Sequence, residues 1–423
     1  MTTHAAIHRA QSGREHHWDA IRALLMLLGI PYHVAMAYRA GQTWIMNSGE
    51  GAAVFTWLAQ AIHAFRMPAF FIIAGYFAAL LLGRRTPGPW LKGRLVRLGV
   101  PFAATILTLN PLLNLLCELS NFSWMAALRS WDHESSTSGG YWVRHLWFLI
   151  VLVYFSAAAA LFCRVLPRLS AATLPARIDG LLARKLIWTI MGTALLVGLW
   201  EGAAIEWFYI KGLNTNLIQQ ILRIDQTIEF LPYFLIGCVI ARAPALKDAL
   251  YRFSPAVALF AVAALALDLA LRDALWPPYG RFLDTLAAIG LTQLLIATIK
   301  RIGDRPSPAV QEMVRASFVI YLFHLPIIAG LVLAGKGLAL PLGLKAGLVM
   351  ALTLALSYGI WCLVRRSPLL LFLFDGTRAP PAAPPPLGAR RPLPRKRLET
   401  GQSLDSGARA RHRRAFAIGP APR

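Results

Sequence analysis

The sequence predicts an all-α fold, a polytopic membrane bundle of about ten transmembrane helices with both termini in the cytoplasm. Of its 423 residues, 57% are hydrophobic and only 15% are charged, whereas soluble domains are about 25% charged. Apolar stretches of about 20 residues, the length that crosses a bilayer, recur along the chain. The Lys and Arg residues gather in alternate connecting segments. A water-soluble enzyme is therefore excluded.

Ten apolar stretches are the expected spans. They cover 20–38, 54–82, 97–116, 145–163, 186–204, 228–241, 253–271, 282–299, 316–334 and 341–363. The second is long enough to begin as an interfacial or tilted piece, and the sixth is short, with Glu229 at its start. Polar residues precede the first stretch, so we expect a retained signal anchor rather than a cleaved signal peptide.

Charge placement sets the expected orientation. With the N-terminus in the cytoplasm, 32 of the 43 Lys and Arg residues fall on the cytoplasmic side and Arg22 lies within the first span. The other ten are counted on the opposite side, including Arg66 of the second span. Without the 13 basic residues after the last span, the ratio is still 19 to 10. This asymmetry follows the positive-inside rule, and it predicts a multi-pass membrane protein with both termini in the cytoplasm.

Three segments are expected. Residues 1–18 form a cytoplasmic N-terminal segment, 19–376 the transmembrane domain, and 377–423 a disordered, basic, Pro-rich cytoplasmic tail containing PPAAPPP and RRPLPRKR. Such a tail beside a membrane favours contact with anionic lipids, and nucleic acid is not an expected partner. The four cysteines have no CxxC spacing, so neither a metal site nor a disulfide framework is predicted.

The first span carries the strongest functional signal, because ionisable groups inside a membrane are costly. Arg22 and His33 are 11 residues apart, about three helical turns, so they share one face at a separation of ~16 Å. Arg22 would hold an anion such as phosphate near the cytoplasm, with Asp19 just before it, and His33 would act as a general base further out. The alternative is structural: Arg22 extends to the interface and His33 bonds a neighbouring helix.

The second span adds His63 and Arg66, which are three residues apart and share a helix face. Their depth is comparable to that of His33, so a cluster of the three is possible. Arg66 is a candidate for binding an anionic group; alternatively, it extends outward or pairs with Glu229. Gly75 is expected to serve close helix packing.

The remaining candidate substrate-binding residues lie in later segments. Arg94 and Arg97 belong to a basic stretch that either fixes topology or forms a platform for phosphates. His145 and Trp147 open the fourth span, and His324 lies in the ninth before Pro326. A lone histidine here is usually structural, but several membrane-embedded histidines raise the expectation of a shared cavity. The outer loops are rich in aromatic and acidic residues, which suit either membrane-interface anchoring or sugar binding.

These segments together resemble the membrane-bound acyltransferase-3 family. Its signature of Arg, ten residues and His in the first span is matched by Arg22 and His33 in DAIRALLMLLGIPYH. The supporting stretches run in order from Asp19 to Gly376: QTWIMNS, IHAFRMPAFFIIAGYF, RLVRLGVP, HLWFLIVLV, FLPYFLIGCVIA, ASFVIYLFHLPI and SPLLLFLFDG. The tail beyond Gly376 and the loop 164–185 show no usable match. Within the family, the match is nearest to members associated with succinylation of osmoregulated periplasmic glucans.

The resemblance implies ten spans, an acyl-CoA co-substrate bound from the cytoplasm, with succinyl-CoA expected, and no tightly bound cofactor. It also implies O-acylation of glucose units of a periplasmic β-glucan, with Arg22 positioning the donor and His33 activating the acceptor hydroxyl. No GxSxG motif occurs, so direct transfer is favoured over a serine acyl-enzyme.

Two other classes remain open at this stage. A glycan transporter or flippase would also have about ten spans and intramembrane charges, although no internal repeat is detected. An accessory subunit of the glucan synthesis or export machinery is the third interpretation. Loss of acyl substituents with intact export would favour the enzyme.

Overall fold

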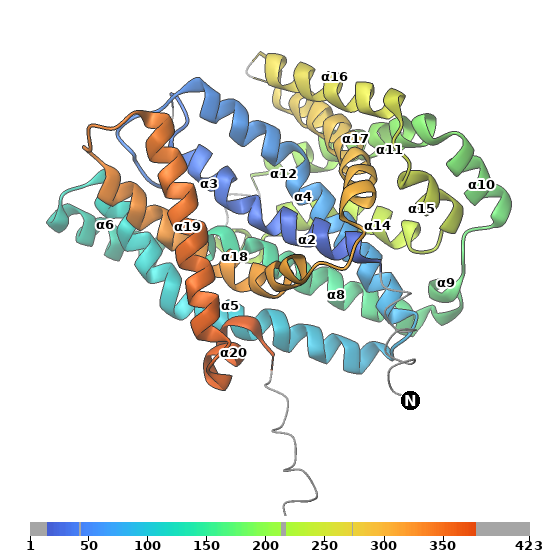
Figure 1. Cartoon of the computed structure of the whole chain (residues 1–423), viewed down its shortest axis with the longest axis horizontal. Coiled ribbons are helices and arrows are strands. Elements are labelled where there is room, and N and C mark those ends of the chain that lie inside the picture. The colour runs from blue at the N-terminus through green and yellow to red at the C-terminus, as the bar shows by residue number, and fades with distance from the viewer. Residues whose placement is uncertain (1–14, 42–43, 213–216, 273, 378–423) are drawn as a thin grey trace, which may run out of the picture. The chain divides into compact units, whose positions relative to one another are not determined.

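The computed structural model describes residues 15–41, 44–212, 217–272 and 274–377. The predicted tail beyond residue 377 and most of the predicted N-terminal segment lie outside the described residues. Within the described part the chain is helical and contains no β-strand (Figure 1). The predicted all-α class is confirmed.

The helices follow one another with short connections. Their bounds are α2 His16–Leu27, α3 Gly29–Ala37, α4 Ala53–Leu82, α5 Pro87–Asn121, α6 Trp124–Thr137, α7 Gly139–Val143, α8 Trp147–Val165, α9 Pro167–Ala171, α10 Ala176–Arg184, α11 Leu186–Trp200, α12 Glu206–Ile210, α13 Leu217–Leu222, α14 Ile224–Ile240, α15 Pro244–Leu250, α16 Pro255–Leu271, α17 Pro277–Gly303, α18 Pro308–Gly335, α19 Leu342–Val364 and α20 Pro368–Asp375. A 3₁₀ turn, Arg144–Leu146, precedes α8, and a π-helical turn, Glu201–Ile205, joins α11 to α12.

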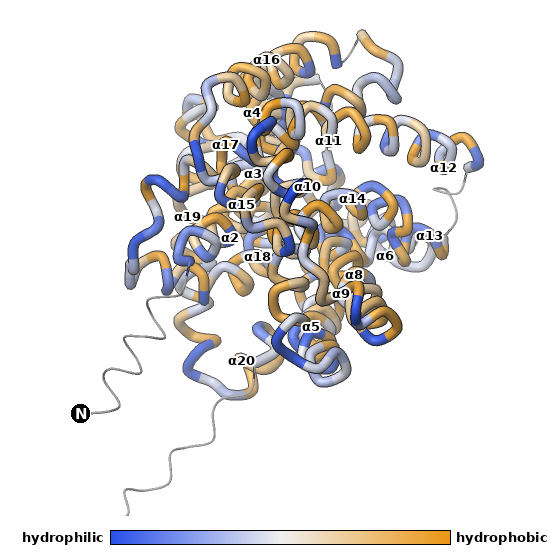
Figure 2. Tube along the Cα trace, turned by 90° about the vertical axis from the view of Figure 1, so that its right-hand side faces the viewer, coloured by the Kyte–Doolittle hydropathy of each residue, from blue (hydrophilic) through white to orange (hydrophobic). Residues whose placement is uncertain are grey.

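Eight helices among the described residues are long and apolar enough to cross a membrane. The two other predicted spans are also helical. The sixth is one limb of a pair, Ile218–Ile240 and Pro244–Leu250, bent by 109°, and the seventh is the 17-residue helix α16. Hydrophobic residues dominate the long helices in Figure 2, as expected for a multi-pass membrane protein.

One helix boundary differs markedly from the prediction. The third span begins at Pro87, ten residues before the predicted start, so Arg94 and Arg97 lie within α5 and not in a connecting loop. Thr86 is extended, and Pro87 occupies the first helical turn, where its missing N–H is not needed. Basic residues lowered the hydropathy of this turn without preventing it from being helical.

Helices α4 and α14 meet backbone to backbone. A Cβ atom added at Gly75 would lie 1.9 Å from the carbonyl oxygen of Phe234, and one added at Gly237 would lie 1.8 Å from that of Ile72. Only glycine fits such a crossing. The predicted packing role of Gly75 is therefore confirmed, and the crossing fixes the position of the α4 segment that carries His63 and Arg66.

A polar cluster ties the start of α2 to its neighbours. Glu15 accepts hydrogen bonds from Trp18, Tyr76, Lys247 and Tyr251 at 2.9–3.2 Å. Burial alone would raise the pKa of Glu15, but the hydrogen bond from Tyr76 and the charge of Lys247 outweigh it and lower that pKa. These contacts anchor the end of the first span that carries Arg22.

Candidate active site

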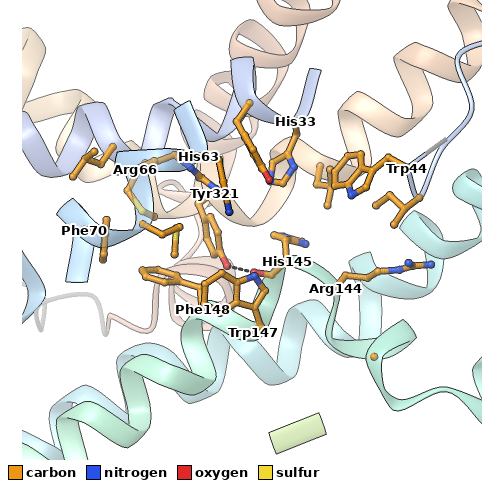
Figure 3. Close-up of a pocket in the computed structure, with 17 residues that line it drawn as sticks. His33, Trp44, His63, Arg66, Phe70, Arg144, His145, Trp147, Phe148 and Tyr321 are labelled. Atoms are coloured by element: carbon orange, nitrogen blue, oxygen red, sulfur yellow. Dashed lines mark hydrogen bonds between the residues drawn. The ribbon is translucent and has the colours of Figure 1, made fainter. Parts of the chain in front are cut away.

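A cavity of about 310 Å³ lies among the first two spans, the start of α8 and helix α18. We call it the histidine cavity (Figure 3). Its polar and aromatic lining comprises Tyr32, His33, Trp44, His63, Arg66, Arg144, His145, Trp147 and Tyr321. In Figure 3, His33 and His63 approach from α3 and α4, while His145 and Trp147 approach from the opposite side. Four helical segments and the connection that carries Trp44 thus supply one site.

Three buried histidines form a contiguous group at this cavity. The ring centroids of His33 and His324 are 5.1 Å apart, and those of His145 and His324 are 5.7 Å apart. The Nδ1 atom of His324 lies 2.6 Å from the carbonyl oxygen of Tyr321. A carbonyl only accepts, so Nδ1 donates and Nε2 of neutral His324 carries the lone pair. The Tyr321 hydroxyl in turn donates to the carbonyl oxygen of His145 at 2.7 Å.

Several ring nitrogens in this group have no hydrogen-bond partner. Within the described residues, these are Nδ1 of His33, both ring nitrogens of His145 and Nε2 of His324, all buried. No carboxylate among those residues pairs with any of the three. Buried polar atoms are normally satisfied, so these nitrogens are available to a ligand. An uncharged imidazole that is free to accept a proton is a suitable general base.

Arg66 brings a permanent positive charge to the same cavity. Its guanidinium carbon lies 4.8 Å from the centroid of the Tyr32 ring, and its Nε is buried without a partner. Gly29 makes room: a Cβ there would lie 3.3 Å from both Arg66 Nη1 and His324 Nε2. Throughout the described ranges Arg66 makes no ion pair, including the possible one with Glu229. An anionic group of a ligand would therefore be stabilised here.

A second cavity, of about 150 Å³, lies at the other end of the first span. We call it the arginine cavity, because Arg22, Arg94 and Arg97 line it together with Trp90 and Phe77. Arg22 lies 5.9 Å from the centre of the Phe77 ring. Arginine forks bind phosphates and carboxylates well, so this cavity can hold an anion.

The arginine side chains have partial partners within the protein. Arg22 lies 3.8 Å from Asp19, and Arg97 lies 4.0 Å from Asp375 on helix α20. Arg94 Nε lies 3.5 Å from the Ser156 hydroxyl. At 3.5–4.0 Å these contacts are long for hydrogen bonds, and they orient the guanidinium groups along the cavity lining.

The two cavities share a wall. Met26, Phe70 and Phe148 line both of them, and the rings of Phe70 and Phe148 meet edge to face at 4.6 Å. Arg22 lies on one side of this apolar wall and His33 lies on the other. The first span thus presents its two ionisable residues to two separate spaces.

The predicted site residues therefore fall into two groups. His33, His63, Arg66, His145, Trp147 and His324 gather at the histidine cavity, and Asp19, Arg22, Arg94 and Arg97 gather at the arginine cavity. Sequence reasoning missed Tyr32 and Tyr321, because both occur in apolar stretches of the sequence. The position of Tyr32, directly before His33, was the signal that could have identified it.

Comparison with known proteins identifies a matching family and several similar sequences. The model of the family described as "Acyltransferase domain" (acyltransferase-3) matches residues 15–362. Similar proteins named "Glucans biosynthesis protein C" include those of Escherichia coli K12 and O1:K1, each 29% identical over 86% of this chain and 94% of the relative. The protein of strain 536 is 30% identical over the same shares. No solved structure gives a significant match.

Proposed function

The chain belongs to the acyltransferase-3 family, and from this premise we propose that it moves a succinyl group from cytoplasmic succinyl-CoA to glucose hydroxyls of a periplasmic glucan. The observation that carries the proposal is the pair of cavities on one membrane-spanning helix. One is lined by arginines and the other by histidines with free ring nitrogens. A donor rich in phosphate suits the first, and a hydroxyl that must lose a proton suits the second.

The proposed step needs positioning and a base. His33 accepts the proton of the acceptor hydroxyl while the hydroxyl oxygen attacks the thioester carbonyl. The tetrahedral intermediate then expels the CoA thiolate, which takes the proton from His33. An ester bond forms and a thioester bond breaks, with no net change in protons or electrons. A thioester is already activated, so holding both reactants in register supplies much of the acceleration.

The position of Arg66 supports the proposal that the transferred acyl group carries a second carboxylate. A succinyl carboxylate inside the membrane needs a cation, because an unpaired one is strongly destabilised. Arg66 lines the histidine cavity and makes no ion pair among the residues that the structure describes. We assign it the carboxylate of the acyl group, and we assign the CoA phosphates to Arg22, Arg94 and Arg97.

The topology that we propose has ten spans, with α14 and α16 completing the eight long helices, and both termini in the cytoplasm of a Gram-negative cell. The distribution of Lys and Arg supports this orientation in the inner membrane. It puts the arginine cavity on the cytoplasmic side and the histidine cavity on the periplasmic side. The printed name of the similar proteins supports a glucan as the acceptor.

The test is charge analysis of periplasmic glucan from a strain that lacks its own enzyme. Complementation with this gene should restore anionic succinyl esters and leave the amount of exported glucan unchanged. Failure of the complemented strain to regain succinyl esters, with the protein present in its membrane, would contradict the acyltransferase role. Loss of export in its absence would instead favour a transporter or an accessory subunit.

A further inference from the structure

A third cavity, of about 400 Å³, adjoins the histidine cavity. We call it the acidic cavity, because Glu201, Glu229 and Asp284 line it, along with Tyr209, Tyr233 and Arg281. His63 and Met67 line both this cavity and the histidine cavity. The two spaces therefore adjoin each other along the α4 segment. Its volume lies in the range of small-molecule sites, about 300–1,000 Å³.

Glu201 is the observation that points to a ligand. Its side chain is only 6% exposed, and its Oε1 atom has no hydrogen-bond partner in the described part of the chain. An unpaired buried carboxylate oxygen is costly, and such atoms are rare in folded proteins. Glu201 begins the π-helical turn that interrupts this span, and π-helical turns occur frequently at functional sites.

The charges of this cavity select the kind of ligand. Arg281 pairs with Glu206, and Arg272 pairs with Asp268, at 2.9 Å, and with Asp284. These arginines are therefore already neutralised. Glu201 and Glu229 make no ion pair with any described residue. The described lining thus has no unpaired arginine for a phosphate or a carboxylate, whereas ligand hydroxyls can hydrogen-bond with the carboxyl groups of Glu201 and Glu229.

Aromatic rings complete the match to a sugar. The Tyr209 ring lies 5.0 Å from the guanidinium carbon of Arg281, and Tyr233 and Phe230 form another part of the lining. Rings with one polar end suit ligands that have an apolar face and hydroxyl edges. The lining thus combines hydrogen-bond acceptors with flat apolar surfaces.

We propose that the acidic cavity binds the glucose units next to the one being acylated. The oligosaccharide reaches from this cavity past His63 into the histidine cavity, where a hydroxyl meets His33. This inference rests on the proposed function, because it takes a glucan as the acceptor. It assigns Glu201 and Tyr209 to acceptor binding and not to the reacting atoms.

Gly280 offers a way to block the cavity without disturbing the fold. It lines the acidic cavity, and a Cβ added there would meet no atom within 4 Å. Gly280→Leu should fill the space, while Gly280→Ala is the matched control. With purified protein and succinyl-CoA, Gly280→Leu should raise KM for a long β-linked gluco-oligosaccharide by about tenfold or more. This is the change expected when a ligand loses roughly one hydrogen bond to the protein. The KM values for glucose and for succinyl-CoA should not change.

Glu201→Gln tests the carboxylate itself, with Glu118→Gln as the control. Glu118 is another buried glutamate, 9% exposed, and it lines none of the three cavities. Only Glu201→Gln should raise KM for the long acceptor. Equal effects of Gly280→Leu on glucose and oligosaccharide, or a raised KM for succinyl-CoA, would overturn the subsite.

A binding measurement separates this proposal from the proposed function. Calorimetry with wild-type protein and oligosaccharide, without donor, should show binding that Gly280→Leu and Glu201→Gln weaken. If wild-type protein transfers no acyl group but shows this binding, the proposed function fails and the subsite stands. Absence of oligosaccharide binding, or Glu201-dependent binding of Ca²⁺ alone, overturns the subsite.

Discussion

The arginine cavity and the histidine cavity lie on one helix, yet their chemistry is opposite. Arg22, Arg94 and Arg97 keep a positive charge at any physiological pH, whereas the buried histidines at the other end offer uncharged nitrogens. A permanent cation is suited to binding an anionic ligand, whereas a proton acceptor is suited to a reaction in which a ligand loses a proton. One helix therefore presents a permanent cation and an uncharged proton acceptor to two separate cavities.

The largest effect should come from the histidine cavity. His33→Ala should reduce glucan succinylation by at least about 100-fold, the lower range for loss of a general base. Membrane insertion should persist, because His33 makes no hydrogen bond through its buried Nδ1 to any described residue. Mass spectrometry of periplasmic glucan measures the loss, with protein content checked by immunoblot. Normal succinylation by a stably inserted variant would remove His33 from catalysis.

Arg66 should separate two donors that differ in charge. Arg66→Ala should lower kcat/KM for succinyl-CoA by about 30-fold relative to acetyl-CoA, corresponding to about 2 kcal/mol for a stranded carboxylate. We take the lower end of the range because Arg66 is half-buried. Both donors are assayed on the same purified variant. An equal loss for the two would exclude Arg66 from binding the acyl group.

Arg22 should affect the donor alone. Arg22→Lys keeps the charge but removes the two-pronged guanidinium, so KM for succinyl-CoA should rise by about tenfold, near 1.5 kcal/mol for a charge-assisted hydrogen bond. The acceptor KM should stay unchanged. Steady-state kinetics with each substrate varied in turn measures both values. A shift confined to the acceptor would reverse the assignment of the two cavities.

The shared wall should keep water away from the donor. Phe70→Ala should raise acceptor-independent release of CoA by about threefold, because closed sites suppress hydrolysis of reactive groups. Phe318→Ala is the control, since Phe318 lines only the arginine cavity. Thiol release without glucan measures the leak. Equal release by both variants would show that the wall does not separate the cavities.

The sequence was informative wherever membrane physics leaves few choices. Apolar length identified the helices, and an ionisable residue in an apolar span identified Arg22, His33 and Arg66 as candidates. The boundary of α5 was wrong because hydropathy marks where lipid begins and not where the helix begins. Thr86 is extended and Pro87 lies in the first helical turn, so that helix starts earlier.

What the sequence could not supply is the arrangement of side chains from distant helices. The meeting of His33, His145 and His324 depends on how three spans pack, and no local spacing encodes it. Glu201 was overlooked although a lone acid in an apolar stretch is the same signal that identified Arg22. Its significance depends on the π-helical turn and on the neighbouring cavity, which only the fold reveals.

The wall of Met26, Phe70 and Phe148 also bears on membrane energetics. In the proposed arrangement, the acyl end of the donor passes this wall to reach His33. A succinyl group carries one negative charge outward, and an interior-negative potential favours a full crossing by about 2.3 kcal/mol per 100 mV. In proteoliposomes, imposing such a potential should therefore accelerate succinyl transfer and leave acetyl transfer unchanged. Insensitivity of succinyl transfer to the potential would show that its carboxylate does not cross the electric field.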